Sequence, residues 1–247
     1  TVIETPGGRV VVYDAGAALG PDVTRRQIAP FLWSRGFRRI DALLMSHADL
    51  DHFNGLPQLM ARFQPARILA TPTFAQRELA GMRRTLESMP RGGNEIEIVH
   101  AGMRWEIDGV GFDVLHPPAQ GPPGKENARS LVVRVTHEGW SMLLTGDLEE
   151  AGLDRLLALP PAPVDVLMAP HHGSDRSNTE ALAKWARPTL VVSSQAEPTS
   201  RRESVAMYTR LGARYLGTWP HGAISIRPAA ADGQVETYRT RLRWKLF

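Results

Sequence analysis

The stretch His47-Ala48-Asp49-Leu50-Asp51-His52 decides how this sequence is interpreted. Imidazole nitrogens and carboxylate oxygens are ligands that Zn²⁺ and Mn²⁺ accept, and the stretch places four of them within six residues. On a tight loop, His47, Asp49 and Asp51 can point to one side while His52 folds back beside Asp51, so two metal ions can share the segment. Gathering these charges after an apolar strand is costly unless a cation compensates. A solvated loop is the other interpretation that these residues leave open.

The neighbouring residues indicate an α/β fold. Ile40–Met45 is a short apolar strand before the cluster, Leu56–Phe63 has helical periodicity, and Ile68–Ala70 is strand-like again, which makes a βαβ unit. Strand and helix patterns alternate a second time after the strand Ser141–Thr145. Earlier, a helix from Thr24 to about Gly36 is expected to bury Ile28, Phe31 and Leu32, and a further helix is expected over Gln76–Met89.

Two segments share one pattern, an Asp, an apolar strand and a His. They are Asp41-Ala42-Leu43-Leu44-Met45-Ser46-His47 and Asp165-Val166-Leu167-Met168-Ala169-Pro170-His171. Ligands gather at the carboxyl ends of strands in open α/β sheets, so we expect both histidines at one edge of a layered structure made of two related halves. Any buried strand that ends in a polar loop would give the same pattern, and this alternative stays open.

Composition limits the classes of function. With 247 residues and 43% hydrophobic content, the chain can bury a large core, and we expect a single domain over 1–247. It has no cysteine, so any metal must bind to His and carboxylate. The formal charge is +3, and nearly all cations are Arg, which suits phosphate contacts. The doublets Arg38-Arg39, Arg83-Arg84 and Arg201-Arg202 are available for such contacts.

The cluster resembles the HxHxDH signature of the metallo-β-lactamase superfamily, with Asp49 in the second His position. Together with Thr145-Gly146-Asp147 and Pro170-His171-His172-Gly173-Ser174, it is similar to the hydrolase domain of ComEC-family DNA-internalisation competence proteins. Tyr13-Asp14-Ala15-Gly16 adds to the resemblance, which covers nearly the whole chain. It implies a four-layer αββα sandwich.

The resemblance also implies a site with two divalent metal ions, Zn or Mn. Asp51, His52, Asp147 and one of His171 and His172 would hold one ion, and His47 and Asp49 the other, with Asp147 bridging and with Asp51 and Asp147 as the catalytic residues. Two metal ions roughly 3.5–4 Å apart lower the pKa of a water molecule between them. They also bind both the attacked and the leaving oxygen of a phosphodiester.

Departures from the family pattern affect the first metal ion and the substrate contacts. Many superfamily members place a further His ligand before the bridging Asp, where this chain offers Asn127 or His116 as alternatives. Asn127, Ser174 and His221 are candidate substrate contacts. The Tyr-Gly-His-Pro stretch of the ComEC-like proteins is replaced by Ser193-Ser194-Gln195 followed by Glu197-Pro198-Thr199-Ser200.

The lead-in to the family's first strand is absent, so we expect the chain to be excised from a longer membrane protein. The resemblance then implies a bacterial inner-membrane protein whose hydrolase domain faces the periplasm or the cell exterior and cleaves single-stranded DNA during uptake. The partners would be DNA and the membrane channel domain of the same polypeptide, and no feature indicates a stable protein partner. Two alternatives stay open: a hydrolase of small phosphodiesters, phosphocholine esters or lactones, and a non-catalytic module that guides DNA.

Overall fold

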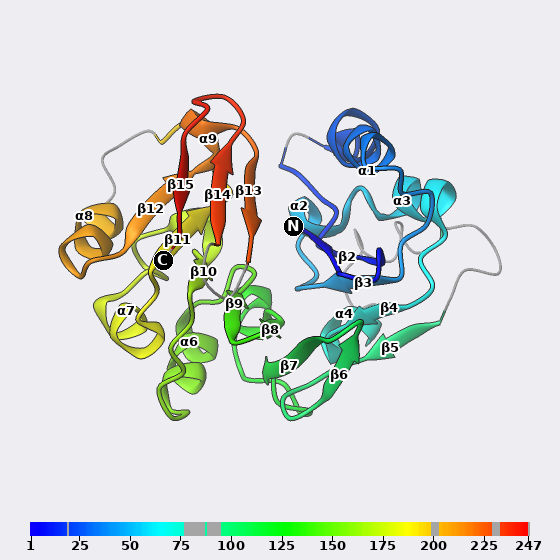
Figure 1. The fold of residues 1–247 in the computed structure, drawn as a ribbon. Helices are drawn as coiled ribbons and strands as arrows, with labels where there is room; N and C mark the ends of the chain where they lie inside the picture. Colours follow the sequence, from blue (N-terminus) through cyan, green and yellow to red (C-terminus); the bar gives the residue numbers. More distant parts are fainter. Residues whose placement is uncertain (19, 77–86, 88–94, 199–202, 229–232, 247) are drawn as a thin grey trace.

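The computed structural model describes residues 1–18, 20–76, 87, 95–198, 203–228 and 233–246, and these residues form two large sheets and one small sheet (Figure 1). Most of the helix expected over Gln76–Met89 lies outside the described residues, as do the doublets Arg83-Arg84 and Arg201-Arg202.

The first large sheet has five strands in the order of the sequence: β1 (Val2–Glu4), β2 (Val10–Tyr13), β3 (Ala42–Met45), β4 (Ile68–Ala70) and β5 (Ile96–Ile98). Strands β1 and β2 are antiparallel, and β2 to β5 run parallel. The predicted βαβ unit is therefore confirmed, because β3 and β4 are parallel neighbours joined through helices α2 (Leu50–Phe53) and α3 (Leu56–Phe63).

The second large sheet has seven strands in the order β12-β11-β10-β9-β8-β7-β6. Strands β6 to β9 are antiparallel and β9 to β12 are parallel. Their bounds are β6 (Arg104–Ile107), β7 (Val110–His116), β8 (Val132–His137), β9 (Trp140–Leu144), β10 (Val166–Met168), β11 (Leu190–Ser193) and β12 (Arg214–Gly217).

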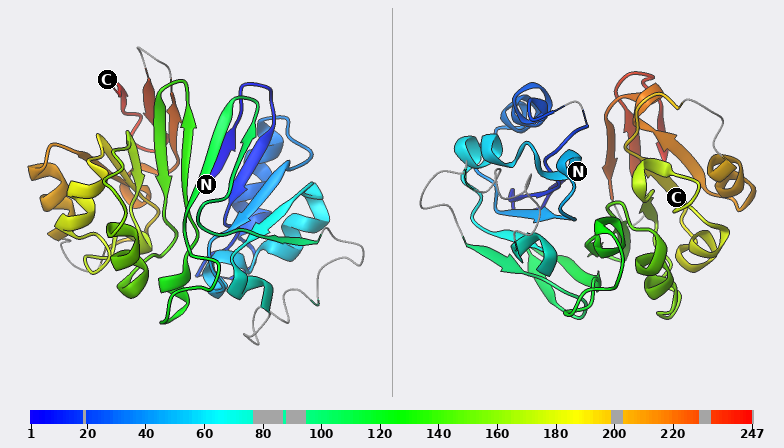
Figure 2. Two further views of the ribbon diagram at one scale, coloured as in Figure 1. Left: turned by 90° about the horizontal axis from the view of Figure 1, so that it is seen from below. Right: turned by 180° about the vertical axis from the view of Figure 1, so that it is seen from behind.

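Alternation along the strands builds the layers. In β2, Val11 packs between the two sheets, whereas Val10 and Val12 pack against the helices of the first half. In β10, Val166 faces the core between the sheets and Leu167 faces the helices of the second half. Figure 2 (left) shows the two sheets face to face, with helices on both outer sides. This is the predicted four-layer αββα sandwich.

The outer layers are short helices. The first sheet is covered by α1 (Ala29–Ser34), α2, α3 and α4 (Pro72–Gln76), and the second by α6 (Glu150–Leu157), α7 (Glu180–Ala186) and α8 (Glu203–Arg210). One expectation about these helices is wrong: Phe31 is 43% exposed, although Leu32 is fully buried. Ile28 and Leu32 both pack on the core, so Phe31 lies at the edge of this face, where the fold leaves it partly uncovered.

The small sheet closes the C-terminal part of the described chain. Strands β13 (Ile224–Arg227), β14 (Gln234–Thr237) and β15 (Arg243–Lys245) are antiparallel and follow the short helix α9 (Thr218–His221). The apolar face of this sheet joins the core between the two large sheets. Among the described helices, none is both long enough and apolar enough for a membrane span.

Candidate metal centre

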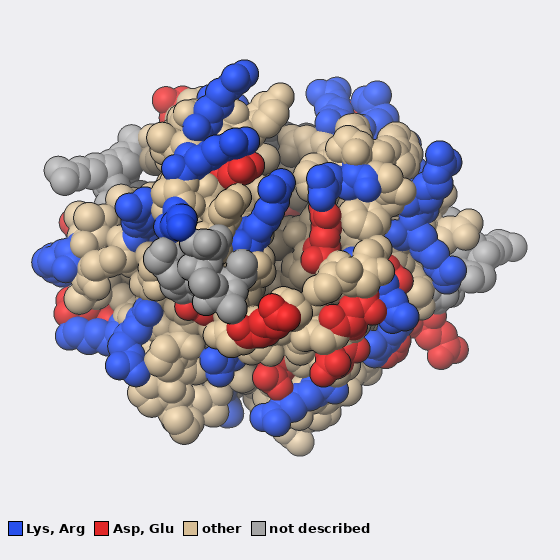
Figure 3. All heavy atoms as spheres, in the orientation of Figure 1, with Lys and Arg blue, Asp and Glu red and all other residues tan. Residues whose placement is uncertain are grey.

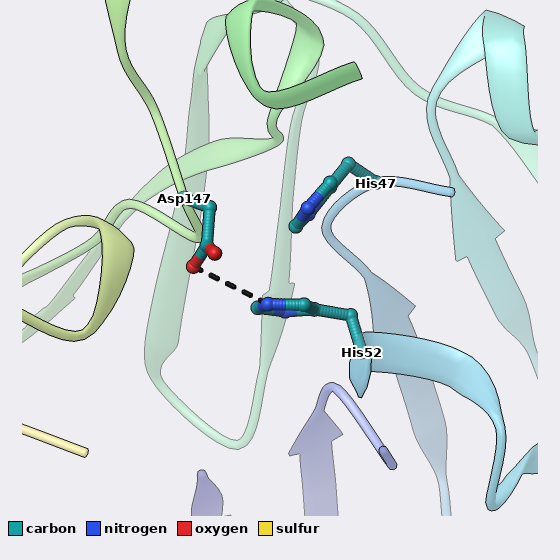
Figure 4. Close-up of side chains that lie close together, drawn as sticks. All are labelled: His47, His52 and Asp147. Atoms are coloured by element: carbon teal, nitrogen blue, oxygen red, sulfur yellow. Dashed lines mark ion pairs between the residues drawn. The ribbon is translucent and has the colours of Figure 1, made fainter. Parts of the chain in front are cut away.

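Three strands end where the candidate site lies. His47 follows β3, Asp147 follows β9 and His172 follows β10, so the two halves of the sandwich contribute to one place at the carboxyl ends of their strands. Figure 4 shows His47 leaving the loop after β3, His52 on α2, and Asp147 on the loop of the opposite half. The expectation that these segments meet at one edge is confirmed.

The first group of potential ligands is His47, His52 and Asp147. One ligand atom from each lies within 4.8 Å of the others, and all three side chains are buried. The Nε2 atoms of His47 and His52 have no hydrogen-bond partner, although His52 Nε2 lies 3.3 Å from Asp147 Oδ1 (Figure 4). Buried nitrogens without a partner cost free energy, and a cation between them and Asp147 would satisfy them. These residues therefore fit a divalent metal ion.

The second group is Asp51, His52 and His172, so it shares His52 with the first. His172 Nε2 lies 3.8 Å from Asp51 Oδ2 and 3.6 Å from Asp147 Oδ2. Contact with His172 lowers the pKa of Asp51, and Asp51 in turn raises the pKa of His172. One imidazole nitrogen binds a single ion, so His52 can serve only one of two neighbouring ions, and the other ion would depend on His47 and the carboxylates around it.

Side-chain contacts distinguish His171 from His172. Both residues have positive φ, 49° and 52°, a conformation uncommon outside glycine. His172 points to Asp51, whereas His171 Nδ1 lies 2.8 Å from Glu149 Oε2. Of the two, His172 belongs to a potential ligand group, while His171 Nε2 lies 3.8 Å from Asp147 Oδ2.

Asp49 lies near the first group without belonging to it. Its Oδ2 is 3.5 Å from His47 Nε2, and its side chain is 45% exposed. Asp49 immediately precedes α2, where its extended backbone turns the chain into the helix that carries Asp51 and His52. Its predicted role as a ligand stays a prediction.

Sequence reasoning assigned no role to Asp14, which positions His52. Asp14 Oδ2 lies 2.8 Å from His52 Nδ1, and Asp14 Oδ1 accepts a hydrogen bond from Ser46 N at 2.8 Å. Burial would lower the pKa of His52, but Asp14 and Asp147 outweigh it and raise this pKa to about 11. A carboxylate on the remote nitrogen fixes the ring so that Nε2 faces the ligand group. The only signal in the sequence was its place in Tyr13-Asp14-Ala15-Gly16.

Glu149 is a second residue that sequence reasoning missed. Its Oε2 holds His171 Nδ1, and its Oε1 accepts a hydrogen bond from Asn127 Nδ2 at 2.9 Å. Asn127, which stands where many superfamily members have a His ligand, thus contacts a carboxylate beside the site. Neither strand periodicity nor motif spacing marked Glu149.

The remaining predicted residues lie around the site. His116 is buried and its Nδ1 is 2.9 Å from Ser130 O, whose side chain in turn accepts a hydrogen bond from Asp147 N. His116 belongs to neither group of potential ligands. The peptide of Ser174 closes the turn after His172, and His221 Nδ1, in α9, lies 2.8 Å from Thr240 Oγ1. The roles of Ser174 and His221 as substrate contacts stay predictions.

A pocket opens onto both groups. Its lining includes Asp51, His52, Asp147 and His172 from the two halves and Thr1 from the start of the chain. Gly16, which also lines the pocket, lies against the loop that carries Asp51: a Cβ on Gly16 would overlap the backbone carbonyl of Asp51. The Asp14-Ala15-Gly16 segment therefore provides the carboxylate that orients His52. Its glycine also lets the segment pack directly against the backbone of Asp51.

Comparison with known families matches these features. The model of the "Metallo-beta-lactamase superfamily" matches residues 1–193. The chain belongs to the metallo-beta-lactamase superfamily. The fold of this superfamily implies a divalent-metal site of the kind that metal-dependent hydrolases use, and the chain has two His/Asp groups that could hold a metal ion.

The predicted likeness to competence proteins is also confirmed. The chain is 29% identical over 216 residues to ComE operon protein 3 of Bacillus subtilis, which covers 85% of this chain and 27% of that protein. It is 27% identical over 249 residues to Competence protein ComA of Neisseria gonorrhoeae, covering 98% of this chain and 32% of the relative. The chain thus spans about a third or less of these relatives. The metallo-beta-lactamase fold protein YhfI from Bacillus subtilis superposes with a TM-score of 0.55 at 10% identity, covering 86% of this chain and 85% of YhfI, which supports the fold.

Proposed function

We propose that this domain is a metal-dependent phosphodiester hydrolase that cleaves DNA during competence-related uptake. The observation that carries the proposal is that five potential ligands lie together, namely His47, Asp51, His52, Asp147 and His172. Two neighbouring cations would suit a phosphodiester, whose attacked and leaving oxygens both need charge stabilisation. The names of two relatives, ComE operon protein 3 and Competence protein ComA, supply the biological context.

The residues of the chain divide the work at this centre. His47 and Asp147 would hold the first ion, and Asp51, His52 and His172 would lie at the second, with Zn or Mn as the candidates. Asp51 and Asp147 are the proposed catalytic carboxylates, and Asp49 is available to the first ion from its exposed position. Divalent ions held there would supply Lewis-acid activation of water and of the phosphate oxygens.

Two carboxylates around these ligands fix the orientation of the histidine rings. Asp14 holds Nδ1 of His52, which leaves Nε2 directed at Asp147. Glu149 holds Nδ1 of His171, which leaves its Nε2 facing the same carboxylate. The buried positions of His47 and His52 restrict water to the open side of the pocket, where Asp51 and His172 are partly exposed.

The setting is proposed from the length of the relatives. Because the chain spans 27% and 32% of the two competence proteins, we propose that it works as the hydrolase domain of a longer bacterial inner-membrane protein. The domain would face the periplasm or the cell exterior, and a membrane channel in the same polypeptide would receive the strand that is not degraded. Single-stranded DNA is the proposed substrate.

The test is cleavage of labelled single- and double-stranded DNA by the purified domain, with and without Mn²⁺ or Zn²⁺. We expect metal-dependent cleavage with little base preference, since backbone contacts carry no sequence information. Asp51→Asn keeps the shape but removes a charged ligand, so it should abolish cleavage and leave DNA binding largely intact. Asp113→Asn is the control, because Asp113 only pairs with the exposed Arg104 on β6.

Three outcomes would overturn the proposal. Unchanged cleavage by Asp51→Asn would remove the metal centre from the reaction. If the metal-loaded domain left DNA intact but hydrolysed a small phosphodiester, a phosphocholine ester or a lactone, the small-substrate hydrolase would replace the nuclease. DNA binding without any hydrolysis would instead favour the non-catalytic guiding module.

A further inference from the structure

Positive charge is concentrated at the end of the chain. Residues 210–247 contain seven of the 29 Lys and Arg but two of the 26 Asp and Glu, so they carry a formal charge of +5, whereas residues 1–209 carry −2. Figure 3 shows Lys and Arg side chains gathered over α9 and β13–β15, beside the hollow between the two halves. Acidic side chains gather lower on the same face. The excess of positive over negative charge therefore lies in the C-terminal segment.

Strand alternation places the cations on the outer face of the small sheet. Ile226, Val235 and Trp244 are paired neighbours across the three strands and pack inward against the core. The alternate positions point outward: Arg227 pairs with Gln234 and Gln234 with Lys245, and Glu236 pairs with Arg243. Apart from Glu236, these outward residues are exposed, and Glu236 is the partner of Arg243 at 3.2 Å. The outer face is polar, cationic and open to solvent.

Aromatic side chains stand at one end of this face. The turn between β14 and β15 is bonded to α9, because Arg239 N donates to His221 O. The turn carries Tyr238, which is 82% exposed, and α9 carries Trp219, which is 42% exposed. Arg239 Nη1 donates to Trp219 O at 2.6 Å and its guanidinium lies 6.0 Å from the Trp219 ring. Arg241 is exposed in the same turn. Among the described residues, neither Arg239 nor Arg241 has a carboxylate partner within salt-bridge distance, so folding leaves these charges available.

A short series of hydrogen bonds fixes this end of the sheet relative to the metal centre. His172 Nδ1 lies 2.8 Å from Ser194 O. The next residue, Gln195, donates its backbone N–H to Thr218 Oγ1 at 2.9 Å, and Thr218 Oγ1 donates back to Gln195 O at 3.1 Å. Thr218 begins α9 and directly precedes Trp219. The aromatic and cationic tip is thus joined through a few bonds to the candidate ligand His172.

We propose that this surface, formed by the outer face of β13–β15 and the tip with Trp219, Tyr238, Arg239 and Arg241, binds a single nucleic-acid strand and leads it to the metal centre. The inference rests on the proposed function and adds the residues that hold the substrate. Exposed aromatic rings stack on unpaired bases of any sequence, and the neighbouring cations contact the phosphates. A duplex keeps its bases stacked inside, so it engages the cations without the rings.

The test measures binding separately from cleavage. In the Asp51→Asn background, the 247-residue chain is titrated with a fluorescently labelled oligothymidylate of about 20 nucleotides, long enough to span a single-strand binding groove, and binding is followed by anisotropy. Tyr238→Ala and Trp219→Ala should each weaken binding about tenfold, from the loss of one stacked base. Arg239→Ala with Arg241→Ala should also weaken binding, and should lower the slope of log affinity against log salt by about 1.4, because each phosphate contact on a single strand contributes about 0.7.

Matched controls separate this surface from general charge and from general exposure of aromatics. Arg62→Ala with Arg155→Ala removes the same charge from the exposed sides of α3 and α6, and Phe31→Ala removes a ring that is 43% exposed on α1. Both controls should bind the oligonucleotide as the background does. Circular dichroism spectra establish that every variant is folded.

The outcomes distinguish this inference from the proposed function. If the four tip substitutions leave affinity unchanged, or weaken it no more than the controls, this surface is not the binding site, while metal-dependent cleavage by the parent would still support the nuclease. If the tip substitutions weaken binding but the parent cleaves no DNA, the strand-binding surface stands and the nuclease falls. If the chain binds phosphatidylglycerol vesicles through the tip and binds no oligonucleotide, the surface contacts a membrane and the inference is overturned.

Discussion

Replacing Asp14 by Asn tests how the metal centre is positioned. Asp14 Oδ1 accepts from Ser46 N, and Oδ2 lies 2.8 Å from His52 Nδ1. In Asp14→Asn, the side-chain carbonyl can keep the bond from Ser46, which places the NH₂ group against His52 Nδ1. That nitrogen must then accept, so the ring proton moves to Nε2, the atom that faces Asp147. The variant therefore blocks the nitrogen that the first and second ligand groups share.

The size of the effect depends on the electrostatics of His52. Asp14 and Asp147 together raise the pKa of His52 from 6.5 to about 11, despite its burial, so they interact strongly with this ring. Loss of a carboxylate that orients a ligating His weakens metal affinity about 10- to 100-fold, which corresponds to about 1.4–2.7 kcal/mol. Backbone strain adds little, because Asp14 has φ of 61° and Asn tolerates this region well.

The assay is calorimetric titration of the metal-free protein with Zn²⁺ or Mn²⁺, comparing Asp14→Asn with the parent and with the control Asp113→Asn. The control should match the parent, because Asp113 lies on β7 and belongs to neither ligand group. Equal affinities for Asp14→Asn and the parent would refute the argument that the Nδ1 contact of His52 determines how Nε2 binds metal.

Three further predictions concern the same region. Asp147→Ala should lose metal when metal is limiting, and a metal content equal to the parent's would contradict this. Metal titration of the parent should be biphasic, because the two ligand groups differ in buried ligands, and two equal tight sites would contradict this. Gly16→Ala should destabilise the fold by about 1–3 kcal/mol in denaturant unfolding, since its Cβ would overlap the Asp51 backbone; a wild-type midpoint would show that the loop yields freely. Burial lowers the pKa of His116 below 6.5 in the folded state. As pH drops below about 6.5, the unfolded chain therefore binds a proton at His116 more readily than the folded chain does, and the free energy of unfolding should fall. In His116→Gln this part of the pH dependence should be absent, and unchanged pH curves would argue against it.

The fold was predictable because its periodicities are strong. Strands β2 and β10 are each covered by the opposite sheet on one face and by helices on the other, so nearly all of their side chains are apolar. Continuous apolar runs in the sequence therefore indicated buried strands. The exposure of Phe31 was not predictable from a 3.6-residue period, because the period indicates an apolar face but not how much of that face the rest of the fold covers.

The candidate site was predictable in its ligand types and less so in its supporting contacts. The dense cluster from His47 to His52 is visible in the sequence because its residues are neighbours. Asp14 and Glu149 lie 38 and 22 positions from the histidines they contact, so only the fold brings them together. The choice between His171 and His172 depended on their contacts, because Glu149 holds His171 whereas His172 lies beside Asp51, and sequence spacing shows neither contact.

The internal similarity between the halves has a physical basis that extends to the site. Asp41 Oδ2 accepts from Val10 N at 2.8 Å, and Asp165 Oδ2 accepts from Ser141 N at 2.7 Å, so each Asp joins the start of its strand to the preceding strand. Both strands then deliver a histidine segment to the same edge. Because the potential ligands come from both halves, a bound cation would connect the two halves of the sandwich. Free energy of metal binding would then stabilise the packing of one half against the other as well as the catalytic loop.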